Sequence, residues 1–215
     1  MKLNLYLTVI TFLMISGCST IVDVSTEEYA RMMLDGTWKS VCVNEEGSPV
    51  SHISEFSFPF ETDKSKIIIN NELFAGQDCQ TENRLFKFEQ QGTMLIETDA
   101  SGDLVPYNAI YDEDSIRANM FVIVLSQTSV TPYADDAIIM LESAYSGCDV
   151  SFTKQTVTDT SKCEQPVWAI NANTTAYAAF YMLNEKQLLA GGMYISKIEA
   201  INDFNENPLF PFTKQ

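Results

Sequence analysis

The chain has 215 residues, of which 46% are hydrophobic and 11% aromatic, and its formal net charge is −16. This composition is typical of a globular protein and excludes a disordered tail, and the length suits one domain with a sizeable core. The negative charge repels phosphate groups, so the sequence argues against nucleic acid as a partner.

The first residues have the pattern of a secretory signal. Lys2 precedes an apolar run from Leu3 to Ile15, and the small residues Ser16 and Gly17 follow it. The run is shorter than the roughly 20 residues that a helix needs to span a bilayer. The pattern therefore predicts a cleaved signal peptide over residues 1–17.

The segment Ile15-Ser16-Gly17-Cys18 resembles the lipobox of bacterial lipoproteins. The resemblance implies that the Cys18 thiol receives a diacylglycerol, that the signal is cut before Cys18, and that a fatty acid such as palmitate acylates the new amino terminus. We then expect residues 18–24 to form a lipidated tether and residues 25–215 to form the exported domain. An Asp directly after the lipobox cysteine would imply retention in the inner membrane, but this chain has Ser19 there. The resemblance therefore implies the outer membrane, on its periplasmic or exterior side. Two alternatives are an ordinary signal peptide with an incidental cysteine, and an uncleaved helix.

The domain begins with one short predicted helix, from about Thr26 to Leu34. Ser25 and Glu28 have the spacing of a capping box, and Gly36 suits a helix stop. From Gly36 the apolar residues alternate with period two, which predicts strands, and Gln90-Gln91-Gly92 has the composition of a hairpin turn. The strands predicted in this part are Thr37–Val43, Ser54–Phe60, Lys66–Phe74, Arg84–Glu89, Thr93–Thr98, Val105–Tyr111 and Ile116–Leu125.

After Thr131 the period changes. Apolar residues at helical spacing predict a second helix over residues 132–145, with Thr131 as its N-cap, although a buried strand is the alternative. A hairpin around Asn184-Glu185-Lys186 and an extended tail over Asn205–Gln215 complete the chain. The strands predicted in the last third are Val150–Val157, Pro166–Ile170, Ala176–Leu183 and Gln187–Ile195. About ten strands with few helices favour an antiparallel barrel or sandwich.

Four cysteines remain besides Cys18, namely Cys42, Cys79, Cys148 and Cys163. An even number in an exported chain predicts two disulfides, and three connectivities are open. We favour the pairs that are near in sequence, Cys42–Cys79 and Cys148–Cys163. Zinc is the competing use of these cysteines, but no CxxC or CxxH spacing supports it.

Gly36-Thr37-Trp38 resembles the G-x-W start of lipocalin-like barrels, and with Cys42 and Asp78-Cys79 the chain is similar to lipocalin-like lipoproteins of Gram-negative bacteria. The resemblance implies a mainly β fold, an antiparallel barrel over residues 25–215 with Trp38 packed across its base. The sequence departs from true lipocalins in its four-cysteine layout and in its helix at 132–145, which lies earlier than their usual late helix.

Few residues suggest catalysis or metal binding. His52 is the only histidine, and beside Ser51 it lacks a recognisable third partner and an oxyanion site. The acidic segments Asp99–Asp103 and Asp112–Asp114 have ligands for calcium, but Asp and Gly are also favoured in turns between strands. We therefore predict no metal, no cofactor and no enzymatic activity.

Aromatic residues are the candidates for ligand contact, and they would either line an apolar cavity or fill a solid core. The set comprises Trp38, Phe56, Phe58, Phe86 and Phe88. The first functional hypothesis is a lipid-anchored barrel that binds a small apolar ligand, with the membrane contacted through the anchor. The second is a structural or protein-interaction module of the envelope with a solid barrel, and an enzyme is the third.

Overall fold

The computed structural model describes residues 26–44, 48–60, 63, 65–111, 114–166, 169–206 and 211–215. The predicted signal peptide, Cys18 and the predicted tether lie outside the described residues. The helices are α1 (Glu27–Leu34), α2 (Asp135–Ala144) and α3 (Lys197–Glu206), with a 3₁₀ turn η1 (Thr81–Asn83). The strands are β1 (Gly36–Lys39), β2 (Val43–Asn44), β3 (Val50–Phe58), β4 (Lys66–Ala75), β5 (Arg84–Ile96), β6 (Tyr107–Tyr111), β7 (Asp114–Pro132), β8 (Thr158–Asp159), β9 (Thr175–Asn184), β10 (Gln187–Ala190) and β11 (Pro211–Lys214).

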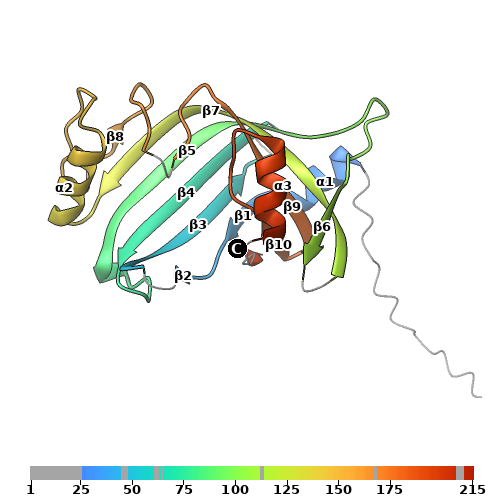
Figure 1. Cartoon of the computed structure of the whole chain (residues 1–215), viewed down its shortest axis with the longest axis horizontal. Coiled ribbons are helices and arrows are strands. Elements are labelled where there is room, and N and C mark those ends of the chain that lie inside the picture. The colour runs from blue at the N-terminus through green and yellow to red at the C-terminus, as the bar shows by residue number, and fades with distance from the viewer. Residues whose placement is uncertain are drawn as a thin grey trace, which may run out of the picture.

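Eight of these strands form a closed antiparallel barrel, as the sequence predicts. Their order is β1–β3–β4–β5–β7–β9–β10–β11, and β11 closes the barrel by pairing with β1. The short strands β2, β6 and β8 pair with β3 or β7 outside this circuit. The strands β3, β4, β5 and β7 continue past the barrel as a curved sheet (Figure 1).

Helix α1 covers one end of the barrel, which we call the closed end. The hydroxyl of Thr26 caps the helix by accepting a hydrogen bond from the Tyr29 amide at 3.4 Å. Ser25, the predicted cap, lies outside the described residues. The indole nitrogen of Trp38 donates to the Leu34 carbonyl at 2.6 Å, which joins the end of α1 to β1. The predicted Trp38 strand is shorter than expected, because the chain leaves the sheet between β1 and β2.

The predicted hairpin at Gln90-Gln91-Gly92 is wrong, because β5 runs through it as one strand of 13 residues. The pairing with β7 shifts register between Gln91 and Gly92, which is a β-bulge. A Cβ atom on Gly92 would lie only 2.3 Å from the Val124 carbonyl oxygen. The glycine therefore serves a close approach of two backbones and not a turn.

The predicted helix after Thr131 is confirmed as α2, and the strand alternative is wrong. Its N-cap is Ala134 and not Thr131, because β7 extends as far as Pro132. The predicted strand Val150–Val157 is a loop, and the described part of Pro166–Ile170 is also loop. Of the described residues in this region, Thr158 and Asp159 pair with β7.

The structure adds a helix that the sequence analysis does not predict. The expected strand Gln187–Ile195 ends at Ala190, and α3 begins at Lys197 and packs on the outer face of β9 (Figure 1). The expected hairpin at Asn184-Glu185-Lys186 joins β9 and β10, and the expected extended tail contains β11.

Buried side chains form three clusters. The barrel core lies inside the barrel, the end core lies beneath α2, and the outer core lies between α3 and the sheet. The predicted interior stretch Met120–Leu125 divides between two of them: Phe121, Ile123 and Leu125 belong to the barrel core, whereas Met120 belongs to the outer core. Among the described residues, no helix has the length and apolarity required to cross a bilayer.

Candidate ligand-binding site in the barrel

Aromatic side chains fill the half of the barrel next to the closed end. Trp38 and Phe58 are 0% exposed, and Phe56 is 6% exposed. The rings of Phe121 and Phe180 stack with centroids 3.9 Å apart, and Phe56 lies 4.9 Å from the Phe212 ring. Trp38, Phe56 and Phe58 thus belong to a packed core.

Phe86 and Phe88 do not join these three residues. They lie farther along β5, in the end core, where Leu141 of α2 and Phe152 of the following loop cover them. In Figure 1, α1 and α2 lie at opposite ends of the long strands. The five aromatic candidates are therefore divided between two cores, because one long strand passes through both.

Polar side chains separate the two cores on the inner wall of the sheet. Ser54 shares its strand face with Phe56, and Gln90 shares its face with Phe88, because alternate residues of a strand point to the same side. The register pairs these residues with inward-facing partners on the next strands, Ser54 with Asn71 and Gln90 with Thr128. We call Ser54, Asn71, Gln90 and Thr128 the polar belt.

The segment after α2 covers one half of the polar belt. The Gln90 side-chain amide donates to the Ile170 carbonyl at 2.8 Å, and the Thr128 and Thr160 hydroxyls are 3.1 Å apart. Gln90 and Thr128 are each 1% exposed. Their hydrogen-bonding capacity is used within the protein, as burial requires.

The other half of the polar belt is partly exposed, and we call it the barrel mouth, formed by Ser54 and Asn71. The Ser54 hydroxyl donates to the Asn71 carbonyl oxygen at 2.7 Å, and the Ser54 amide donates to the buried Ser40 hydroxyl at 3.0 Å. Both residues are of intermediate exposure although they face inward. Within the described part of the chain, the Asn71 side-chain nitrogen makes no hydrogen bond. Solvent therefore reaches the inner wall at this point.

Both predicted disulfides are confirmed, with the predicted pairing. The Cα atoms are 5.8 Å apart in Cys42–Cys79 and 5.5 Å apart in Cys148–Cys163. The first bridge joins the segment before β2 to the loop after β4. The second closes the loop that follows α2 and covers the end core, to which Cys163 belongs.

The other sequence candidates do not form a site. His52 and Ser51 are adjacent in β3 and so point to opposite faces of the sheet, and the Ser51 hydroxyl accepts a hydrogen bond from the Cys79 amide. Asp99 accepts from the amides of Ser101 and Asp103, as a turn residue does. Asp112 and Glu113 lie outside the described residues. No group of three potential metal ligands occurs among the residues that are described.

A charged network that sequence reasoning missed joins α3 to the barrel. Glu97 accepts hydrogen bonds from the Tyr107 hydroxyl at 2.7 Å and from the Lys197 ammonium at 2.6 Å. Burial would raise the pKa of Glu97, but these two bonds outweigh burial and hold that pKa below its usual range. Burial, with the Asp203 carboxylate nearby, raises the pKa of Tyr194 to about 12. Lys197 lies 100 residues from Glu97 in the sequence, so no local motif signals the ion pair.

Comparison with known proteins finds no matching family model and no similar curated protein. The features of this chain that bear on its function are therefore the barrel, the mouth and the sequence pattern of the N-terminus. At the mouth, the inward-facing residues Ser54 and Asn71 are partly exposed to solvent.

Proposed function

We propose that this protein is a lipoprotein of the bacterial cell envelope, anchored in the outer membrane through acylated Cys18, that binds a small apolar ligand at the barrel mouth. The pattern Ile15-Ser16-Gly17-Cys18 supports the anchor. The two disulfides support an exported, oxidising location. We propose a binding role without catalysis.

One observation carries the ligand-binding part of the proposal. Ser54 and Asn71 face inward and yet remain partly exposed, directly beside the apolar side chains of Phe56 and Leu73. Small-molecule sites are concave and mostly apolar, with a few polar groups that orient the ligand. The barrel mouth has this combination.

The chemistry of the mouth limits the class of ligand. The two groups that define the mouth, the Ser54 hydroxyl and the Asn71 amide, are neutral, His52 shares the strand face of Ser54, and the chain as a whole is strongly acidic. An apolar molecule with a neutral polar head suits it better than a carboxylate does. The filled barrel core restricts such a ligand to the mouth and leaves Trp38 and Phe58 out of contact with it.

Ligand binding is tested with an apolar dye that fluoresces in dry sites, titrated into the full-length protein in a non-ionic detergent. We expect saturable binding near one to one, with stronger competition from fatty alcohols than from fatty acids. Asn71→Trp should block the mouth and weaken dye binding. Asn70→Trp is the matched control, because Asn70 faces outward and bonds Glu55. Equal binding by both variants, each shown to be folded by its melting curve, would place the dye elsewhere.

The anchor is tested separately in cells. Wild-type protein should incorporate labelled palmitate and fractionate with outer-membrane markers, whereas Cys18→Ser should remain unlabelled. Label in the variant would show that Cys18 is not the acylated residue. Fractionation with inner-membrane markers would contradict the proposed location.

The packed barrel core favours a second candidate, a solid-barrel module for structure or protein interaction. Its support is the set of fully buried rings that fill the closed-end half. Absence of saturable binding across neutral lipids would favour this candidate over the ligand carrier.

A further inference from the structure

A second recess lies outside the barrel, on the exposed side of α1. It is a pocket of about 570 Å³ between the helix and the chain that follows β3. It is lined by Thr26, Glu28, Tyr29, Arg31, Met32, Asp35 and Phe60. Glu28, Arg31, Met32 and Asp35 recur at spacings of three and four residues, so they form one stripe of the helix. The pocket is separate from the barrel mouth, which lies on the far side of the barrel core.

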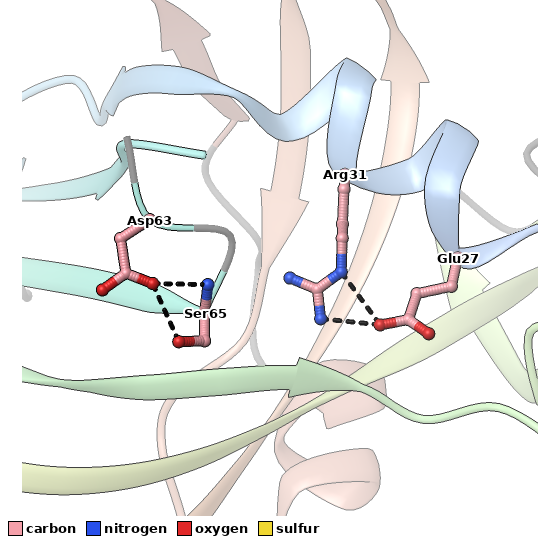
Figure 2. Close-up of polar contacts among 4 residues, drawn as sticks. All are labelled: Glu27, Arg31, Asp63 and Ser65. Carbon is pink, nitrogen blue, oxygen red and sulfur yellow. Dashed lines mark hydrogen bonds and ion pairs between the residues drawn. The ribbon is translucent and has the colours of Figure 1, made fainter. Parts of the chain in front are cut away.

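The charges of the pocket leave a negative excess. Arg31 is the one cation among the described lining residues, and both its Nε and a terminal nitrogen donate to the same oxygen of Glu27, at 2.9 and 2.6 Å (Figure 2). The Arg31 guanidinium also lies 5.3 Å from the centre of the Phe60 ring. With Arg31 paired to Glu27, the carboxylates of Glu28 and Asp35 give the described part of the lining a negative excess.

Asp35 is placed to receive a positive group. One of its carboxylate oxygens accepts a hydrogen bond from the Phe60 amide at 2.8 Å, which fixes the side chain against the pocket wall. Asp35 is also the C-cap of α1, where the helix dipole is negative and favours cations. Lys214 approaches the same helix end from the barrel side, where it bonds the Met33 carbonyl and does not line the pocket.

The other lining residues are mostly apolar, and such a lining suits an organic cation better than a metal ion. Met32 is 61% exposed, and the Tyr29 ring is partly exposed beside it. The pocket is far larger than a metal ion, and no cluster of three or more potential metal ligands is found in the described residues. Alkylated ammonium groups are attracted both to carboxylates and to aromatic faces.

We propose that the α1 pocket binds an organic ammonium compound, with its positive group beside Asp35 and Glu28 and its apolar part against Tyr29 and Met32. This site does not depend on the barrel mouth or on the ligand proposed for the mouth. It would give the protein a second binding function, for positively charged molecules and not for negatively charged ones such as fatty acids.

The probe is benzyltrimethylammonium, titrated by calorimetry into the full-length protein in an uncharged maltoside detergent, with phenylacetate as the anionic comparison. We expect saturable binding of the ammonium compound and none of phenylacetate. Asp35→Asn keeps an acceptor for the Phe60 amide while it removes the charge, and should weaken binding about tenfold. Glu28→Gln should weaken it less, because Glu28 is more exposed.

Glu142→Gln is the matched control, since it removes one exposed carboxylate from α2 at the other end of the molecule. It should leave ammonium binding unchanged, as should Asn71→Trp at the barrel mouth. Equal losses in Asp35→Asn and Glu142→Gln would show a general attraction to an acidic protein and overturn the site. Equal binding of phenylacetate, or no saturable binding, would overturn it as well, and neither result bears on the barrel mouth.

Discussion

At the scale of single residues, Trp38 joins three parts of the closed end. Its ring is fully buried in the barrel core, its indole nitrogen bonds α1, and its backbone pairs with both β3 and β11. The Lys214 ammonium lies 5.4 Å from the ring centre. The G-x-W motif thus marks a position where packing, a helix end and barrel closure meet.

We therefore predict a large loss of stability for Trp38→Ala, roughly 3–5 kcal/mol, because a cavity is left in a packed core. Denaturant unfolding monitored by circular dichroism measures it. Trp38→Phe is the milder companion, since it retains much of the ring volume and loses the hydrogen bond to Leu34. A Trp38→Ala variant as stable as Trp38→Phe would show that the ring contributes little to the core.

The residue scale also shows what a sequence leaves ambiguous. A glycine in the sequence is compatible both with a turn and with a close approach of two backbones. For Gly92, the position of Val124 in space shows that the close approach is the reason. Phe56 and Phe86 both alternate on strands, so their period predicts burial correctly but cannot say in which core each is buried. The barrel mouth was missed for a related reason. Ser54 and Asn71 are ordinary strand residues until register brings them together.

At the scale of elements, local signals predicted some features and missed others. Helices α1 and α2 were found because apolar residues recur at helical spacing in each. Helix α3 carries the same signal, with Ala200 and Phe204 buried four residues apart. It was missed because the strand before it was predicted to continue to Ile195, whereas β10 ends at Ala190. The strands expected at 150–157 and 166–170 failed because alternation over a few residues also occurs in a packed loop.

The second disulfide determines how that loop covers the end core. Replacing both Cys148 and Cys163 by Ser should lower stability by roughly 2–5 kcal/mol, a typical cost for a native bridge in an exported domain. We expect the thermal midpoint to fall and amide hydrogen exchange to rise mainly between residues 146 and 166. Peptide mapping without reduction should first show both bridges in the wild type. Exchange that rises equally throughout the barrel would contradict this local role.

At the scale of the whole molecule, closure of the barrel depends on β11, which pairs with both β10 and β1. Phe212 faces inward and is 7% exposed, whereas its neighbour Thr213 faces solvent. Phe212→Asp should abolish cooperative unfolding or lower the midpoint strongly, because it buries a charge in the barrel core. Thr213→Asp, in the same strand, should change the midpoint little. Comparable losses for both would show that strand pairing, and not the inward side chain, is the sensitive feature.

The neighbouring positions of β1 and β11 also set an order of events in time. The first strand begins at Gly36, and its partner β11 ends at Lys214, so the two strands pair across most of the described domain. While the chain is made or moved from its amino end, β1 and β10 each keep one edge without that partner, and unpaired edges invite wrong pairing. Contacts between residues so far apart also form slowly. Until β11 has been made and has paired with both strands, the barrel therefore keeps two open edges at which another chain can pair.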